Sequence, residues 1–295
     1  MRTFRLVIVG ILFLAACSPA WYYPHLDWLL PWYIRDYVTL DQTQQSELDN
    51  RLGRQLEWHC RTQLPAYAGF LRSVKRDFEN PEHTASLQQF QAYYGMLQIY
   101  WKELLARIAP DVADLLMSAT DLQIDALFRK IEADNRKLEG KYVDPPLEEI
   151  VQQRDDRMSE RLGVWIGDIE DGQKSAIREW SNQLGTYGAA WMANRRALQQ
   201  RFRALLAGRT DNPDFKVQFI ALLTAPKSTP EAAYSAQVAH RTTLTLDLLT
   251  RIAASLTTEQ RRHLLDHLTG LADDLDRMAC PVTPEIITGR EGDPR

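Results

Sequence analysis

Apolar residues recur at alternating steps of three and four along most of the chain from Thr39 onward. This spacing places them on one face of an amphipathic α-helix. One such stripe consists of Ile177, Trp180, Leu184, Tyr187, Trp191, Leu198, Phe202 and Leu205. It predicts a single helix of about 35 residues. Two more stripes, within 244–256 and 264–275, predict two helices near the C-terminus.

Proline-containing breaks separate these stripes. They fall at 80–81, 144–146, 211–213 and 226–230. No sustained period-two alternation bounded by turn residues occurs, so we expect no strands. The pattern therefore predicts an all-α fold, a single bundle of about seven to nine helices over residues 39–280. Residues 281–295 turn polar and contain Pro and Gly, and we expect a flexible tail there.

The N-terminus follows a different pattern. Arg2 and Arg5 precede an apolar run, Leu6–Ala16. This run of about eleven residues is too short to cross a bilayer, which needs roughly 20. A basic start, a short apolar run and small residues are typical of a secretory signal peptide, here residues 1–16.

The last residues of this segment, Leu14-Ala15-Ala16-Cys17, resemble the lipobox of bacterial lipoproteins. The resemblance implies cleavage before Cys17, a diacylglycerol with palmitate-type chains on its thiol, and an acyl chain on its new amine. Two or three chains anchor a protein durably, whereas one binds only marginally. Ser18 at the next position favours the outer membrane in sorted lipoproteins. We therefore expect an envelope protein that faces the periplasm.

Residues 17–38 are unusually aromatic for a tether. The stretch 21–33 holds three tryptophans and three tyrosines, and Pro24 and Pro31 exclude one long helix. Trp and Tyr favour the headgroup zone of a membrane, so the segment could lie on the bilayer surface. The favoured interpretation is that it folds back and packs on the helical domain, because so many rings can build the edge of a core.

Two cysteines remain besides Cys17. Cys60 continues a stripe of apolar residues four apart (Leu48, Leu52 and Leu56), so it should point inward, and Cys280 ends the last periodic segment. In an oxidising compartment the two are candidates for a disulfide that joins the first helix to the last. The alternative is two separate buried thiols.

Four helix starts share one form, with a capping residue followed three positions later by glutamine. They pair Asp41 with Gln44, Thr120 with Gln123, Glu170 with Gln173, and Thr257 with Gln260. In such a capping box the side chain of the capping residue accepts a hydrogen bond from the backbone N–H three residues later. The glutamine side chain in turn accepts from the backbone N–H of the capping residue. Glu is a poorer cap than Thr or Asp, so the third start is the weakest.

Leu256-Thr257-Thr258-Glu259-Gln260 also resembles the Leu-Thr-x-x-Gln motif of periplasmic chaperones of the Spy and CpxP type. That resemblance implies a helical protein that shields unfolded clients on a concave surface. The favoured interpretation is a capping role alone. This chain is also longer than those chaperones, acidic rather than basic, and carries the lipobox.

Along the whole chain, the closer resemblance is to a family of uncharacterised bacterial lipoproteins. It rests on the lipobox, on Leu26-Asp27-Trp28-Leu29 with Trp32-Tyr33, and on the helix start Tyr37–Gln44. The resemblance implies no particular activity.

Charge narrows the range of partners. Without residues 1–16 the chain keeps 33 Lys and Arg (35 minus 2) against 39 Asp and Glu, a net charge of −6. A nucleic-acid-binding domain normally shows a strong basic excess, so we expect no nucleic-acid partner.

Candidate chemistry is sparse. His263 and His267 lie four apart on a helix, a spacing that can hold a metal, but position 264 lacks the Glu of the metalloprotease pattern. Adjacent helix positions such as His59 and Cys60 point apart and do not form a nucleophile pair. Arg195, Arg196 and Arg203 lie on the back of the long stripe, where they could contact lipid phosphates or another anionic envelope polymer; solvated arginines are the simpler account.

No phosphate-binding loop, nucleophile elbow or catalytic carboxylate pair is recognisable, and we expect neither an enzyme nor a bound cofactor or metal. The expected role is non-catalytic, either binding of a peptide or protein segment or a chaperone-like activity. The alternatives are a structural adaptor of an envelope complex and, least favoured, an enzyme acting on envelope polymer.

Overall fold

The computed structural model describes residues 19–80, 85–224 and 232–281. The predicted signal segment 1–16, Cys17 and the tail beyond Pro281 lie outside these residues. The described chain consists of helices and their connections, without a strand, which confirms the all-α prediction. The ten helices from α4 to α13 exceed the predicted seven to nine.

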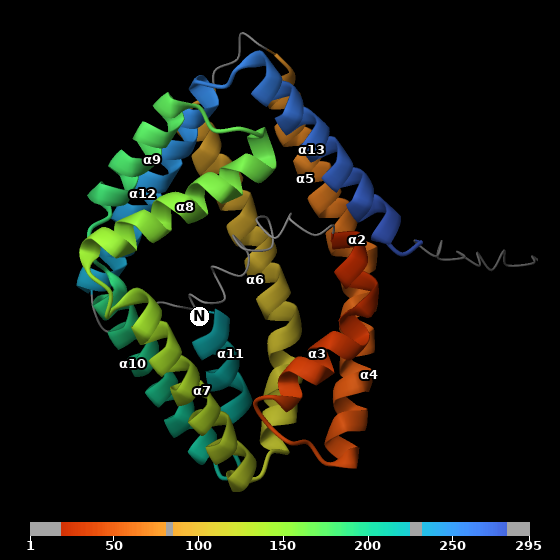
Figure 1. The fold of residues 1–295 in the computed structure, drawn as a ribbon. Helices are drawn as coiled ribbons and strands as arrows, with labels where there is room; N and C mark the ends of the chain where they lie inside the picture. Colours follow the sequence, from red (N-terminus) through yellow and green to blue (C-terminus); the bar gives the residue numbers. More distant parts are fainter. Residues whose placement is uncertain (1–18, 81–84, 225–231, 282–295) are drawn as a thin grey trace, which may run out of the picture.

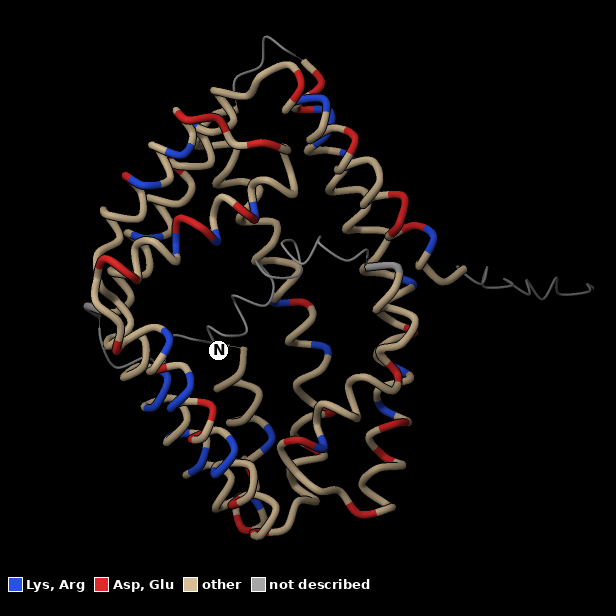
Figure 2. Tube along the Cα trace, in the orientation of Figure 1, with Lys and Arg blue, Asp and Glu red and all other residues tan. Residues whose placement is uncertain are grey.

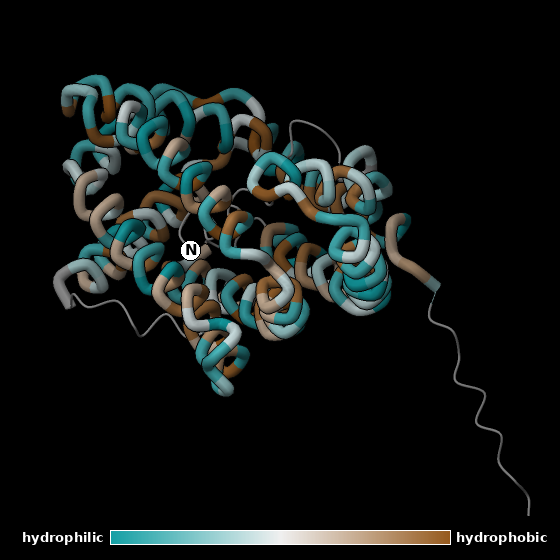
Figure 3. Tube along the Cα trace, turned by 90° about the horizontal axis from the view of Figure 1, so that it is seen from below, coloured by the Kyte–Doolittle hydropathy of each residue, from teal (hydrophilic) through white to brown (hydrophobic). Residues whose placement is uncertain are grey.

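The helices follow in the order α2 (Pro19–Tyr22), a 3₁₀ turn η1 (Tyr23–His25), α3 (Leu26–Arg35), α4 (Gln42–Trp58), a π-turn η2 (His59–Gln63), α5 (Leu64–Glu79), α6 (Leu87–Met117), α7 (Asp121–Tyr142), α8 (Leu147–Ile166), α9 (Asp171–Gln183), α10 (Gly188–Ala207), α11 (Phe215–Thr224), α12 (Ala232–Ala254) and α13 (Thr258–Met278). Figure 1 shows α6 running through the middle of the molecule, with the other helices arranged around it. Apolar and polar stretches alternate along the helices, as expected of amphipathic segments (Figure 3).

The largest core lies where α5 and α13, the most extensively packed pair of helices, meet α8, α9 and α12. Ala68 of α5 and Ala272 of α13 are almost fully buried (0% and 1% exposed), and their small side chains allow close packing. A smaller core joins the end of α6 to α7, α10 and α11, and a third joins the ends of α7, α10 and α12. The molecule therefore has several cores rather than one central seam.

The predicted helix of about 35 residues is wrong. Two helices, α9 and α10, take its place, separated by a turn at Gly185, whose φ is +54°. A positive φ favours glycine and ends a helix. The apolar stripe continues on both sides of the break, but its residues pack into different cores. Trp180 packs into the largest core, Phe202 into the second and Trp191 into the third.

Candidate functional site

The glutamines of the first two predicted helix starts, Gln44 and Gln123, bond to each other. Each side-chain amide donates to the other's oxygen, at 3.1 and 2.7 Å. Each Oε1 also accepts from the backbone N–H of its own cap, Asp41 for α4 (3.1 Å) and Thr120 for α7 (2.8 Å). We call Gln44 and Gln123 the first glutamine pair. It joins the beginnings of two helices that lie 79 residues apart.

The other two starts form a second glutamine pair, Gln173 and Gln260. Their amides donate to each other at 2.9 Å in both directions, across 87 residues of sequence. Gln173 accepts from the N–H of Glu170 at 3.0 Å, and Gln260 from that of Thr257 at 3.1 Å. Both glutamines are buried, with exposures of 2% and 4%.

The bonding scheme of the two pairs is the same. Every amide Nε2 also donates to a backbone carbonyl two residues before the cap of the partner's helix. In the first pair, Gln44 donates to Ser118 and Gln123 to Thr39. In the second pair, Gln173 donates to Ser255 and Gln260 to Asp168. A side-chain amide offers two donors and accepts two bonds, and these contacts fill all four. The glutamines therefore tie helices together and have no hydrogen-bonding capacity left for a client.

Cys60 and Cys280 form a disulfide, with their Cα atoms 5.1 Å apart. Cys60 lies in the π-turn η2 and Cys280 follows the end of α13. The backbone N–H of Cys280 also donates to the carbonyl of Cys60 at 3.2 Å. The bridge therefore fixes the end of α13 at the junction of α4 and α5.

The same junction holds the N-terminal segment. The Tyr23 hydroxyl lies 3.0 Å from Nδ1 of His59, within hydrogen-bond distance. Burial lowers the pKa of His59 to about 4 and raises the pKa of Tyr23 to about 12. At neutral pH the tyrosine therefore keeps its proton and the imidazole is neutral, and the tautomer of His59 decides which of the two groups donates the hydrogen bond. Neither group is suited to exchange protons with a substrate near pH 7.

A groove of about 760 Å³ opens beside the disulfide. Three segments far apart in the sequence line it: η1 with the start of α3, the end of α4 with η2, and the end of α13 with Cys280. Its apolar lining includes Tyr23, Leu56 and Met278 together with the disulfide. Its charged residues are Asp27, Glu57, Asp274 and Arg277. Glu57 pairs with Arg61 at 2.9 Å, and Asp274 pairs with Arg277, so two of the three carboxylates already have cationic partners within the protein. The groove therefore suits an apolar segment, with Asp27 as the carboxylate outside these two ion pairs.

The aromatic segment 21–33 both packs on the domain and faces outward. Tyr23 is half-buried and Pro31 is buried against the helices behind it. Trp21, Trp28 and Trp32, in contrast, are 62%, 53% and 62% exposed. The segment therefore packs on the helical domain through some of its residues and exposes its tryptophans, so neither packing on the domain nor lying on a membrane describes it completely.

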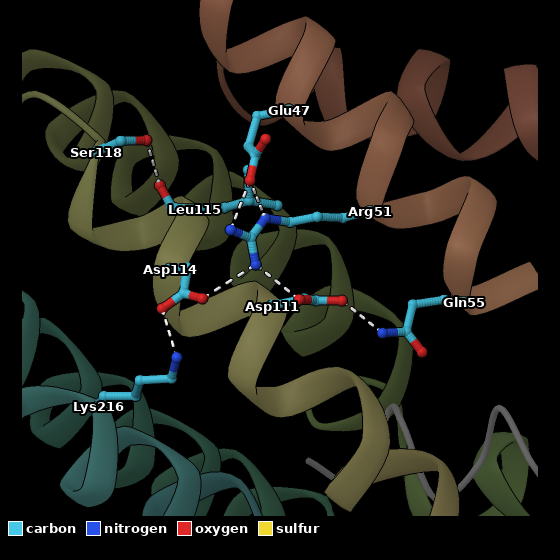
Figure 4. A network of polar contacts seen from close by, with 8 residues as sticks. All are labelled: Glu47, Arg51, Gln55, Asp111, Asp114, Leu115, Ser118 and Lys216. Carbon is cyan, nitrogen blue, oxygen red and sulfur yellow. Dashed lines mark hydrogen bonds and ion pairs between the residues drawn. The ribbon is translucent and has the colours of Figure 1, made fainter. Parts of the chain in front are cut away.

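An ion network around Arg51 joins α4, α6 and α11 (Figure 4). Arg51 donates to Asp111 at 2.6 Å and to Asp114 at 3.0 Å, and Lys216 reaches Asp114 at 2.7 Å. Burial alone would raise the pKa of Asp114, but the bonds from Lys216 and Arg51 outweigh it and lower that pKa. Sequence analysis missed this network; its only local signal is the i, i+4 spacing of Glu47, Arg51 and Gln55 on α4.

The predicted anionic-contact arginines of α10 bond within the protein, where basic positions are dense along α7 and α10 (Figure 2). Arg196 bridges Glu132 (3.1 Å) and Glu139 (2.9 Å) of α7, and Arg203 bridges Asp125 at 3.0 Å. Arg195 donates to the buried Asn135 at 2.7 Å, and burial lowers its pKa. These contacts hold α10 against α7 and neutralise much of the charge that an anionic polymer would need.

The candidate metal residues do not assemble a site. His267 meets Trp165 edge to face with ring centroids 4.7 Å apart, and Nε2 of His263 lies 3.3 Å from the carbonyl of Val164. Within the described residues, no three side chains of His, Cys, Asp or Glu converge as metal ligands would. None of the described helices is both long and apolar enough to cross a membrane.

Comparison with known proteins gives one match. Residues 36–235 match the family of unknown function DUF6279, about two thirds of the chain. The chain belongs to this family. No curated protein and no solved structure matches it.

In this DUF6279 protein the match covers the first glutamine pair, the Arg51 network and the arginines of α10. The second pair lies partly beyond it, since Gln260 follows residue 235. The aromatic segment 21–33 and Cys280 also lie outside it. The groove beside the disulfide is therefore built largely from elements that flank the matched region.

Proposed function

We propose that this protein is a lipoprotein of the bacterial cell envelope, anchored by acyl chains on Cys17, whose helical part binds a segment of another protein without catalysis. The resemblance of Leu14–Cys17 to a lipobox supports the anchor, and Ser18 supports the outer membrane with the helical part facing the periplasm. These residues lie outside the described structure, so the anchor rests on the sequence alone.

The groove beside the disulfide carries the proposed binding role. Its volume of about 760 Å³ lies within the range of roughly 300–1,000 Å³ found for ligand pockets. Tyr23, Leu56 and Met278 offer apolar contact, and Asp27 offers a carboxylate to a basic side chain. An extended peptide with apolar and basic side chains has both properties.

The chemistry of the groove favours binding over catalysis. General acid–base groups work best with a pKa near the operating pH. Tyr23, which lines the groove, has the pKa of its hydroxyl raised to about 12 by burial. It therefore keeps its proton at neutral pH and does not act as a proton shuttle.

A structural adaptor is the second candidate. One wall of the groove is the segment that directly follows the proposed anchor, and the bond from Tyr23 to His59 fixes that wall to the domain. A groove held in this way would stay near the membrane and present itself to one partner there. A chaperone would instead accept many unrelated clients.

Site-specific photo-crosslinking in cells tests the proposal. A photoreactive amino acid in place of Met278, which lines the groove, should crosslink to protein, whereas the same residue in place of Val217, 69% exposed on α11, should not. Many crosslinked products at position 278 indicate a chaperone-like role, and one discrete product an adaptor. No crosslink at 278, or equal yields at both positions, would contradict a binding role for the groove.

A further inference from the structure

Exposed apolar side chains are concentrated in one short segment. Of the eleven large apolar residues that are exposed in the described chain, six fall within 21–33: Trp21, Tyr22, Trp28, Leu30, Trp32 and Tyr33. Single exposed apolar residues are normal on a soluble surface, but a contiguous group marks an interaction site.

The rings from Trp21 to Trp28 form a row. Trp21 contacts His25 with centroids 5.8 Å apart, and His25 contacts Trp28 at 6.1 Å. Trp32 lies four residues beyond Trp28 in α3, which places both on the same side of that helix. We call Trp21, Trp28 and Trp32 the aromatic face.

The aromatic face is held in a fixed orientation from behind. Tyr23 bonds to His59, and Pro31 is buried in the middle of α3. At the end of the segment, the Tyr37 hydroxyl donates to Asp134 at 3.0 Å, and Tyr33 and Tyr37 lie within hydrogen-bond distance of each other. The tryptophans therefore project from a surface that is tied to α4 and α7.

We propose that the aromatic face inserts into the headgroup zone of the membrane that carries the acyl chains on Cys17. The inference rests on the proposed lipid anchor. Only four residues of chain lead from Cys17 to Trp21, and they span at most about 14 Å. An anchor in the bilayer therefore keeps the backbone of Trp21 within that distance of the Cys17 backbone, close to the lipid headgroups.

The chemistry of the face fits this location better than a dry interface. Tryptophan and tyrosine combine an apolar ring with an N–H or O–H group, and they concentrate at the membrane–water boundary for that reason. All three residues of the face are tryptophan.

This arrangement sets the orientation of the whole molecule. Figure 1 places α2 and α3 on the side of the molecule opposite α9 and α10. The groove shares Tyr23, Pro24 and Asp27 with the inserted segment, so it would open beside the bilayer surface. The α9–α10 side would extend away from the membrane.

Quenching of tryptophan fluorescence by brominated lipids tests the inference. The acylated full-length protein is reconstituted into vesicles of phosphatidylethanolamine and phosphatidylglycerol brominated near the glycerol. Three of its eight tryptophans belong to the face, so we expect partial quenching. The variant Trp21→Ser/Trp28→Ser/Trp32→Ser should lose nearly all of it.

The matched control is Ile99→Ser/Leu122→Ser/Val217→Ser, which removes three apolar residues that are exposed elsewhere (46%, 81% and 69%) and should keep the quenching. Equal circular dichroism of all three proteins shows that they fold alike.

Intact mass on the same samples separates the two proposals. If the protein is acylated but its tryptophans are not quenched, insertion of the aromatic face is overturned and the anchor stands. A dimer in light scattering would then indicate that the aromatic face binds a second copy of the chain. Protein without acyl groups overturns the anchor and the inference together.

Discussion

At the scale of single residues, the four paired glutamines have the most demanding environments. Each fills all four hydrogen bonds of its side-chain amide, and Gln173 and Gln260 do so while buried. A buried polar group that loses its partner costs about 1–3 kcal/mol, more than the bond itself contributes.

Replacement of Gln260 with Ala should therefore lower the free energy of unfolding by about 2–4 kcal/mol, since it leaves the Gln173 amide and the Thr257 N–H without their partners. Urea denaturation measures the change. In a double-mutant cycle Gln173→Ala and Gln260→Ala should be strongly coupled, while Gln123→Ala and Gln260→Ala, from different pairs, should add. Additive effects within the second pair would show that its amides do not depend on each other.

His59 predicts a pH dependence of stability. Its pKa of about 4 in the folded protein lies below the ordinary value of about 6.5, so between these values the unfolded chain binds more protons than the folded one. The free energy of unfolding should fall as the pH drops from about 6.5 to about 4, by on the order of 2–3 kcal/mol from this residue. His267 acts in the same direction, because burial and then His263 lower its pKa.

The variant His59→Phe keeps a ring in place but cannot titrate, so its stability should depend less on pH in this window. His25, exposed at the surface, provides the control as His25→Phe. Identical pH profiles of the wild type and His59→Phe would show that the imidazole is not held neutral in the folded state.

At the scale of secondary-structure elements, the start of α10 packs on the end of α7 with no room for a side chain. A Cβ on Gly188 would lie 2.1 Å from the carbonyl oxygen of Tyr142. That oxygen belongs to the backbone and cannot move aside alone, so α10 would have to shift.

Gly188→Ala should lower the free energy of unfolding by on the order of 3 kcal/mol, because the added methyl overpacks this contact. Gly53→Ala is the control. Gly53 lies inside α4 with nothing near its Cβ position, so alanine there should raise stability by about 0.5–1 kcal/mol. Thermal unfolding compares the two, and equal effects would contradict the close approach of α7 and α10.

Helix starts could be predicted from sequence because a capping box is local. The caps at Asp41, Thr120 and Thr257 all begin helices in the structure. That their glutamines meet in pairs could not be predicted, since it depends on tertiary packing across 79 and 87 residues. The prediction of one continuous helix through Gly185 was wrong for a related reason. Periodicity indicates which side of a helix is apolar, but not whether that side packs into one core or into several.

At the scale of the whole molecule, the disulfide closes a loop of 220 residues. It joins the start of the helical domain to its end and forms part of the groove wall. In the chain-entropy model a loop of this length contributes at most about 5 kcal/mol.

Reduction of the Cys60–Cys280 bridge should therefore shift urea unfolding to lower concentration, by up to about 5 kcal/mol in the free energy of unfolding. The double variant Cys60→Ala/Cys280→Ala should match the reduced wild type and no longer respond to reductant. An unchanged midpoint after reduction would contradict a bridge that restrains the fold.

The fold class could be predicted from the sequence, but the groove could not. Its lining comes from positions near 25, 57 and 277, so no local motif records it. The arginines of α10 were visible as a basic cluster, yet their carboxylate partners on α7 became apparent only when the two helices were placed side by side.

The central claim is a lipid-anchored protein closed by one disulfide, and intact mass of the membrane-extracted protein tests it most directly. The account predicts a chain that begins at Cys17 with the mass of two or three acyl groups, and a gain of about two daltons on reduction, one hydrogen for each sulfur of the bridge. An unacylated chain that still carries residues 1–16 would contradict the anchor, and an unchanged mass on reduction would contradict the bridge.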